Sequence, residues 1–396
     1  MEITSKPNTN LSFDNTAIAF SSKTDKDLTL SYWLFKVINS NFLVKIGPPI
    51  TTFAMNIGLP ISPIIRATIF KQFCGGESIS DCEKTINHLG EFAIGTILDY
   101  SVEGEETEAA FDQTCTETIA TIHKAASSKN IPFSVFKVTG LGAFTILEKI
   151  QAKDMLSAAE QAAWERVKAR VEKICATAAE KKVRIFIDAE ESWIQVTIDD
   201  LANEMMAKFN KTEIIVYNTY QFYRHDRLAY LQNCVTNAKS EGYKIGAKLV
   251  RGAYMEKERK RAIDMGYESP IQPTKATSDK DYDAALAFCI QHIDSVAICA
   301  GTHNENSSLV LVKLMSENNI PANHPHIFFS QLLGMSDNLS FNLAKAGYNV
   351  AKYVPYGPVK AVLPYLFRRA NENTAIAGQM GRELSLIISE RKRRKN

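Results

Sequence analysis

The chain has 396 residues, of which 45% are hydrophobic and 23% are charged, and its formal net charge is +2. This length allows one barrel-sized domain or two ordinary domains, and the composition excludes a largely disordered chain. A charge this close to neutrality gives no overall attraction to nucleic acid. The seven cysteines are scattered, without the spacing of a zinc site or a disulfide framework, and they indicate reduced thiols in a cytosol-like compartment.

The N-terminal region, residues 1–90, is predicted to form a helical arm. Its first residues have neither the apolar core of a signal peptide nor the Arg-rich pattern of a transit peptide. Residues 1–20 are typical of a poorly ordered end or a lone helix, and residues 31–47 have the spacing of a packed or surface-lying amphipathic helix. Four prolines between residues 46 and 65 argue against a membrane-spanning helix there.

From residue 91 onward, short segments rich in β-branched and aromatic residues alternate with helical stretches. This alternation predicts an α/β fold, a distorted (β/α)8 barrel over residues 91–385, followed by a basic tail at 386–396. An open doubly wound sheet is the alternative, weakened because no GxGxxG follows a first strand. The predicted strands are 96–102, 133–139, 183–189, 213–220, 244–250, 295–301, 326–332 and 349–355.

Polar residues gather at the C-terminal ends of these predicted strands. Barrel enzymes build their active sites on that face, so the pattern favours an enzyme over a purely structural barrel. The residues are Lys137, Asp188, Gln221, Arg251, Thr302, His303, Asn304, Gln331 and Tyr353.

A second polar cluster is expected on a helix with Pro364 in its first turn. Tyr365, Arg368, Arg369 and Glu372 have i, i+3 and i+4 relations and therefore share one helical face. A guanidinium fork suits a carboxylate or a phosphate. The alternative is a solvated basic face paired with an acid.

Between about residues 70 and 385 the following motifs occur in order: FCGGES (73–78), FKVTG (136–140), IDAEES (187–192), TYQFYRHD (219–226), AKLVRGAYMEKER (247–259), GTHN (301–304), QLLGMSD (331–337), YVPYGP (353–358) and YLFRRANEN (365–373). In these motifs the chain resembles the proline dehydrogenase family. The resemblance implies a monofunctional enzyme, without an aldehyde dehydrogenase or DNA-binding domain, that oxidises L-proline to 1-pyrroline-5-carboxylate. Side chains cannot accept a hydride, and the family uses non-covalent FAD for this step and passes the electrons to a quinone-type acceptor.

Carried over motif by motif, the resemblance implies two sets of residues. The arginine pair and Lys137 would hold the substrate carboxylate, and Tyr353 would cover the substrate ring. The substrate set is Lys137, Tyr254, Tyr353, Tyr365, Arg368 and Arg369; the FAD set is Asp188, Ala189, Gln221, Lys248, Val250, Arg251, Gly252, Ala253, Lys275, Thr302, His303, Asn304, Gln331 and Glu372.

Several points stay open at the level of sequence. The order of charges in KLVRGAY does not decide which of Lys248 and Arg251 contacts the isoalloxazine ring. Another flavin-dependent barrel oxidoreductase, such as a nicotinamide-using reductase, and a non-catalytic barrel are the alternative functions. No metal site is expected, because His324 and His326 have no third ligand nearby.

The C-terminal run RKRRKN is either a solvated end or a contact with an anionic membrane surface. We therefore expect a cytoplasmic protein, with peripheral contact at the inner face of the membrane as the further option. No nucleic-acid partner is expected.

Overall fold

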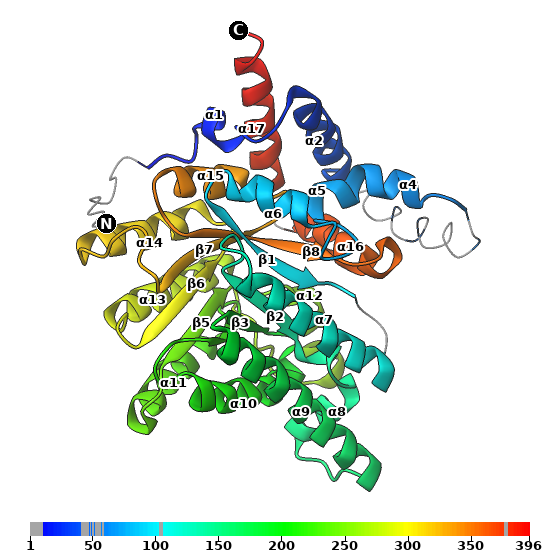
Figure 1. The fold of residues 1–396 in the computed structure, drawn as a ribbon, viewed down its shortest axis with the longest axis vertical. Coiled ribbons are helices and arrows are strands. Elements are labelled where there is room, and N and C mark those ends of the chain that lie inside the picture. Colours follow the sequence, from blue (N-terminus) through cyan, green and yellow to red (C-terminus); the bar gives the residue numbers. More distant parts are fainter. Residues whose placement is uncertain are drawn as a thin grey trace. The chain divides into compact units, whose positions relative to one another are not determined.

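Eight parallel strands close into a barrel in the order β1 to β8 in the computed structural model (Figure 1). This confirms the predicted barrel and excludes the open doubly wound sheet. The structure describes residues 11–40, 59–102, 106–375 and 379–396 and the single residues 47, 49, 51 and 57, while the side chains of 369–380 lie outside the described part. The strands are β1 (Ile94–Tyr100), β2 (Phe133–Lys137), β3 (Arg184–Asp188), β4 (Val216–Gln221), β5 (Ile245–Val250), β6 (Val296–Gly301), β7 (Ile327–Leu332) and β8 (Val350–Tyr356).

The chain divides into two compact units, and the first spans residues 104–330. Its helices alternate with strands as the sequence predicts. One of them, α9, begins after Ser157, whose side chain and that of Glu160 form a capping box, so local sequence defines this end. The helices are α7 (Glu108–Ala126), η2 (Val138–Gly140), α8 (Phe144–Ala152), α9 (Ala158–Lys181), α10 (Ser192–Phe209), α11 (Arg227–Glu241), α12 (Met255–Met265), α13 (Lys275–Gln291) and α14 (Glu305–Glu317).

Aromatic rings fill the first unit beneath its polar strand ends. Phe133 stacks on Phe186 with ring centroids 4.4 Å apart, and it meets Tyr217 and Phe328 edge to face. Phe133 and Phe186 are fully buried. Along β2 and β3 these aromatic residues come before the charged residues Lys137 and Asp188. The close packing of the rings limits the movement of the strand ends that carry the charges.

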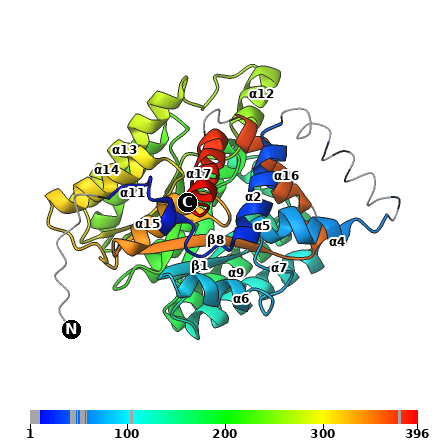
Figure 2. The ribbon, with the colours of Figure 1, turned by 90° about the horizontal axis from the view of Figure 1, so that it is seen from above.

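The second unit holds residues 10–103 and 331–396, including β1 and β8. Its core joins Phe35, Phe73, Leu366 and Leu386 from four different helices. Helix α2 packs beside α17 (Figure 2). The helices are α1 (Thr16–Ala19), α2 (Asp25–Ile38), α4 (Ser62–Ile65), η1 (Arg66–Phe70), α5 (Lys71–Phe73), α6 (Glu83–Gly90), α15 (Asp337–Lys345), α16 (Val359–Ala375) and α17 (Gln379–Arg393).

Helix α16 begins earlier than the sequence predicts. It starts at Val359, so Pro364 lies inside the helix and not in its first turn. The Val359 N–H donates to the Glu77 carboxylate at 3.3 Å, which satisfies one of the donors at this helix end. The predicted start was too late, because the helical hydrogen bonds already begin at the Pro358 carbonyl, which accepts from the Ala361 and Val362 N–H groups.

None of the described helices is long and apolar enough to cross a membrane. The described part of the predicted amphipathic segment 31–47 is mainly the end of α2, which stops at Ile38. Residues 1–10, at the predicted lone helix or poorly ordered end, lie outside the described residues.

Candidate active site

Two lysines and one aspartate meet at the ends of β2, β3 and β5. Lys137 and Asp188 are the last residues of their strands, and the strand register makes them direct neighbours. The Asp188 carboxylate accepts a hydrogen bond from Lys248 Nζ at 2.5 Å, and Lys137 Nζ lies 3.8 Å from its other oxygen. One carboxylate faces two ammonium groups, so the cluster has an excess of positive charge that favours an anion.

The sequence also allows Lys137 to be a barrel-lining lysine paired with Asp188 or Glu190, and the structure shows the contact with Asp188. Lys248 is buried, and its ammonium group lies 5.5 Å from the centroid of the Phe186 ring. A cation held over an aromatic face and beside a carboxylate has a narrow range of positions.

Arg251 forms the centre of a second cluster, just after β5. Its guanidinium donates to Asp279 at 2.7 Å, to Thr302 Oγ1 at 2.8 Å and to Ser307 Oγ at 2.8 Å. The same group lies 4.3 Å from the centroid of the Tyr282 ring. These contacts hold the planar fork in one orientation.

Lys275 and Asn304 complete this second cluster through the same aspartate. Lys275 Nζ donates to Asp279 at 2.5 Å, and Asn304 Nδ2 lies 3.4 Å from it. Burial by itself would raise the pKa of Asp279, but hydrogen bonds and charge from Lys275 and Arg251 hold that pKa below its ordinary value. Arg251 and Lys275 together exceed Asp279 in charge, so this cluster also suits an anion.

Asp279 and Ser307 were not among the predicted site residues. Asp279 lies in the first turns of α13, which begins at Lys275 behind a Thr274 cap. The i, i+4 spacing of Lys275 and Asp279 was the available signal.

Gln221 and Glu190 connect the ends of β4 and β3. Gln221 Nε2 donates to the Glu190 carbonyl at 2.9 Å, while the buried Gln221 Oε1 has no hydrogen-bond partner among the described residues. The Glu190 carboxylate accepts hydrogen bonds from the Thr139 N–H at 3.1 Å and from the Thr139 hydroxyl. Burial raises the pKa of Glu190 to about 7, against these hydrogen bonds, which lower it.

The segment after β5 passes close to an aromatic ring. Gly252 has a φ of +132°, and a Cβ there would lie 2.4 Å from the Tyr223 ring. Only glycine fits this backbone position.

The other predicted residues of these loops differ in exposure. Val250 ends β5, Ala253 is exposed, and the half-buried Tyr254 precedes α12. Ala189 and His303 are half-buried, directly after β3 and just beyond β6.

The remaining predicted residues belong to the second unit. Gln331 is buried, and its Oε1 accepts a hydrogen bond from Ser340 Oγ at 2.7 Å. Tyr353 is buried in the middle of β8, which continues to Tyr356, one residue beyond the predicted strand end. Tyr365 is buried and Arg368 half-buried on one face of α16. Arg369 and Glu372 lie on the same helix, but their side chains are outside the described residues.

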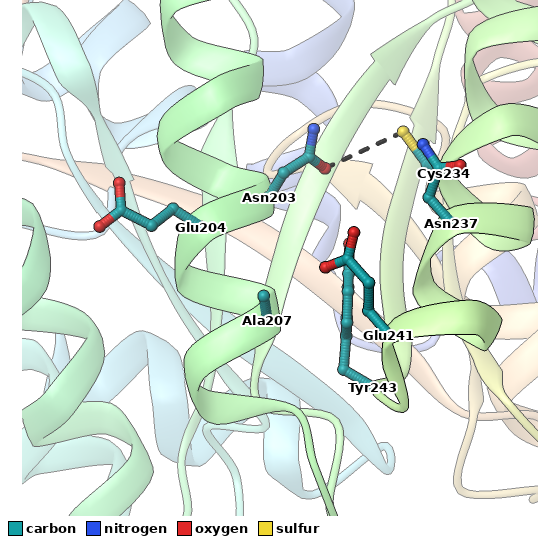
Figure 3. Close-up of a pocket in the computed structure, with 7 residues that line it drawn as sticks. All are labelled: Asn203, Glu204, Ala207, Cys234, Asn237, Glu241 and Tyr243. Carbon is teal, nitrogen blue, oxygen red and sulfur yellow. Dashed lines mark hydrogen bonds between the residues drawn. The ribbon is translucent and has the colours of Figure 1, made fainter.

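Two surface depressions of the first unit lie away from these residues. The smaller has a volume of about 240 Å3, and facing turns of α10 and α11 carry its lining side chains, among them Asn203 and Cys234 (Figure 3). The larger, about 520 Å3, includes Arg184, Glu213 and His326 near the starts of the strands. Neither contains a predicted site residue. The described residues include no group of three or more His, Cys, Asp or Glu side chains that could hold a metal ion.

A closed parallel barrel whose charged and amide side chains stand at the carboxyl ends of the strands defines an α/β-barrel enzyme. Comparison with known proteins gives the family. The sequence profile described as "Proline dehydrogenase" matches residues 82–382. The chain therefore belongs to the proline dehydrogenase family, whose reaction is the oxidation of L-proline to 1-pyrroline-5-carboxylate.

Individual relatives agree with the family assignment. "Proline dehydrogenase 1, mitochondrial" of Dictyostelium discoideum is 32% identical over 426 residues, covering 96% of this chain and 74% of the relative. The human protein of the same name is 41% identical over 258 residues, covering 64% of this chain and 41% of the relative.

The structural comparison supports the same fold. Proline utilization A (PutA) from Bdellovibrio bacteriovorus aligns with a TM-score of 0.72 at 19% identity, covering 94% of this chain and 40% of that chain. The expectations of a proline dehydrogenase barrel and of an oxidoreductase are confirmed at the level of the family.

Proposed function

We propose that this chain oxidises L-proline with a non-covalently bound FAD, and that the residues at the carboxyl ends of the strands form its site. The observation that carries the proposal is the cluster in which Lys137 and Lys248 share Asp188. Its excess positive charge suits the substrate carboxylate or the electron-rich flavin ring.

The described residues fit a flavin in three respects. Gln221 Oε1 is a buried acceptor without a partner among them, as a ring N–H donor requires. Gly252 keeps the backbone after β5 free of a side chain. Arg251, held by three partners, is a rigid donor for a phosphate or a ring carbonyl.

FAD, when bound, supplies the hydride acceptor that no side chain can provide. The other FAD residues in this proposal are Asp188, Ala189, Lys248, Val250, Ala253, Lys275, Thr302, His303, Asn304, Gln331 and Glu372. The proposal allows either assignment of the two basic residues: one of Lys248 and Arg251 contacts the isoalloxazine ring and the other contacts the phosphates.

The chain's own residues bind and orient the substrate. Lys137, Arg368 and Arg369 hold the proline carboxylate by charge-assisted hydrogen bonds, which fixes the ring carbon that loses the hydride. Tyr353, Tyr254 and Tyr365 cover the pyrrolidine ring and exclude water from it. Hydride loss is easier from the neutral amine, so the substrate nitrogen must give up its proton before or during the step.

Anaerobic titration of the purified protein with L-proline tests this function. Bleaching of a bound flavin absorbance band by L-proline supports the proposal. Reduction by NADH but not by proline would identify a nicotinamide-using reductase instead. Protein that purifies without flavin and cannot be reconstituted with FAD would support a non-catalytic barrel.

We also propose that the electrons pass to a quinone-type acceptor at an anionic membrane surface. Helix α2 exposes Trp33 and Val37 beside Lys36, and Lys392 and Lys395 are exposed at the end of the chain. Exposed tryptophan beside lysines suits the boundary between lipid headgroups and acyl chains. All seven cysteines are free, which supports a reducing compartment such as the cytoplasm.

Vesicle binding tests the membrane contact. Arg394 donates to Glu390, to Asp25 and to backbone carbonyls, so removing the whole tail would also remove structural contacts. The better variant is K392E/K395E, which we expect to bind phosphatidylserine vesicles less at low salt with unchanged dye-linked activity. The matched control is K239E/K280E, at exposed lysines elsewhere. If K392E/K395E and K239E/K280E bind the vesicles equally well, the C-terminal lysines have no specific part in membrane binding.

A further inference from the structure

Glu190 connects two predicted parts of the site. Its carboxylate accepts hydrogen bonds from the N–H and the hydroxyl of Thr139, in the 3₁₀ turn directly after Lys137. Its carbonyl accepts the hydrogen bond from Gln221 Nε2 at 2.9 Å, and its N–H donates to Gln195 Oε1 at 2.8 Å. With 3% of its surface exposed, Glu190 is held in one position between the two strand ends.

The charge of Glu190 changes the balance of the lysine cluster. Lys137 and Lys248 exceed Asp188 by one positive charge, and the Glu190 carboxylate is hydrogen-bonded to Thr139, two residues after Lys137. An ionised Glu190 cancels that excess, and a protonated Glu190 leaves it in place.

Two other carboxylates of the first unit lie near Glu190 in the chain or on the neighbouring helix α12, and each has polar partners of its own. Glu191, its neighbour in the loop, forms an ion pair with Lys257 of α12. Glu258, also from α12, accepts two hydrogen bonds from Ser192 at the start of α10, both at 2.6 Å. Gln195 of α10 contributes no charge. Glu190 is the carboxyl group hydrogen-bonded to the turn directly after Lys137, so its ionisation changes the charge beside that lysine.

We propose that Glu190 is a positioning residue whose protonation controls how tightly the Lys137 end of the site holds a carboxylate. This inference rests on the proposed function, since it takes the substrate carboxylate to bind at Lys137. When Glu190 is protonated, the cluster attracts the anion; when it is ionised, the attraction weakens.

The direction of the pH effect follows from the burial of Glu190. Burial raises its pKa to about 7, so the residue ionises as the pH rises through neutrality. Carboxylate affinity should therefore fall across this range. By linkage, a bound anion raises the pKa of Glu190 further, so binding near pH 7 takes up protons from solution.

The test uses tetrahydrofuran-2-carboxylate, a proline isostere whose ether oxygen replaces the amine. The probe has no group that titrates near neutrality, so any pH dependence belongs to the protein. Isothermal titration of the flavin-loaded protein should show affinity falling roughly tenfold between about pH 6 and about pH 8.5. Titrations at pH 7 in two buffers of different ionisation enthalpy should show net proton uptake.

Variants separate this role from a structural one. E190Q cannot ionise, so its affinity should stay constant with pH and its binding should take up no protons. T139V removes a hydrogen bond that stabilises the ionised form, so it should move the midpoint of the affinity profile to higher pH. E383Q is the matched control, because Glu383 is another buried carboxyl group whose pKa is raised to about 7, mainly by burial. It should keep the parent's profile.

The outcomes distinguish the inference from the function on which it rests. A parent protein that binds the probe with no pH dependence and no proton uptake would overturn the role of Glu190 while leaving the carboxylate site intact. The same follows if E190Q or T139V keeps the parent's profile. If the parent does not bind the probe at any pH, the substrate assignment itself is overturned, and the inference with it.

Discussion

Asp188 shows how a single residue determines the charge of its surroundings. It accepts a hydrogen bond from Lys248, and Lys137 lies 3.8 Å away. Asp279 has the same position in the second cluster, between Arg251 and Lys275. In both clusters one carboxylate orients two basic groups and balances the charge of only one of them. One positive charge is therefore left for a bound anion.

The arginine pair on α16 allows a prediction at this scale. Arg368→Lys keeps the charge but loses the planar fork, so KM for L-proline should rise about tenfold to a hundredfold, corresponding to about 1.5–3 kcal/mol for a charge-assisted hydrogen bond. Arg369→Met should also reduce proline turnover sharply. Flavin content should stay at the parent's level in both variants. Steady-state kinetics would reject the carboxylate assignment if both variants turned over proline as the parent does.

The proposed position of Tyr353 over the substrate ring leads to a prediction about the preference between L-proline and its 4-hydroxylated form. A phenol ring against the pyrrolidine leaves a 4-hydroxyl group without space or without a hydrogen-bond partner. Losing hydration in this way costs about 1–3 kcal/mol, or about tenfold to a hundredfold in specificity. We therefore expect L-proline to be preferred over trans-4-hydroxy-L-proline.

The substitution Tyr353→Ser should narrow this preference, mainly by reducing proline affinity. The measurement is kcat/KM for both substrates in parent and variant. Equal values in the parent, or an unchanged ratio in the variant, would place Tyr353 outside the substrate pocket.

At the scale of elements, β8 carries different chemistry on its two faces. Successive residues of a strand point to opposite sides, so Lys352 and Tyr353 face opposite ways. Lys352 is completely buried, and its Nζ donates to Asp337 of α15 at 2.7 Å and to the Met335 carbonyl at 2.6 Å. Lys23 adds a second cation 3.3 Å from Asp337. These contacts attach the strand that holds Tyr353 to α15.

Removing one partner of this buried pair should destabilise the protein. Lys352→Met leaves Asp337 with Lys23 alone, so we expect a loss near the lower end of about 3–5 kcal/mol in unfolding free energy. The double variant K352M/D337L should recover part of the loss, because the buried carboxylate that lost Lys352 is also removed. Recovery is incomplete because Lys23 loses its contact with Asp337.

Denaturant unfolding measures this effect. The control is Lys260→Met, which breaks an exposed i, i+4 pair with Asp264 and should cost less than about 0.5 kcal/mol. A single K352M variant as stable as this control would show that the buried pair contributes little.

At the scale of the whole molecule, each compact unit buries a carboxyl group that titrates near neutrality. Glu190 belongs to the first unit and Glu383 to the second, where it accepts a hydrogen bond from the Ser336 N–H. Burial raises both pKa values to about 7 from an ordinary value of 4.5. Between about pH 4.5 and about pH 7, these two groups therefore bind more protons in the folded chain than in the unfolded chain.

The stability of the protein should consequently fall as the pH rises through this window. For an acid with a raised pKa, the unfolded state ionises at lower pH than the folded state. The free energy of unfolding therefore falls between about pH 4.5 and about pH 7, and above this range the group causes no further change. Each group contributes on the order of 2–3 kcal/mol. E383Q and E190Q should each flatten the decline of Tm measured from about pH 5 to about pH 8. A decline as steep in both variants as in the parent would contradict this assignment.

Local patterns in the sequence were sufficient to predict the barrel. Alternating strand and helix signals located all eight strands, since burial in a parallel barrel requires short β-branched and aromatic runs. The capping box of Ser157 and Glu160 at the start of α9 is likewise a local feature of the sequence. The polar residues at the strand ends were visible because the barrel brings all carboxyl ends to one face.

Partners from distant parts of the chain could only come from the tertiary structure. Asp279 orients Arg251, and Glu190 connects Thr139 with Gln221. Asp337 pairs with Lys352, and Glu77 accepts a hydrogen bond from the first N–H of α16. Hydrogen bonds and ion pairs depend on separations of a few ångströms, and these depend on packing and not on spacing along the sequence. The sequence alone therefore predicts the barrel and its active face, while the charge and proton affinity of the site depend on the folded arrangement.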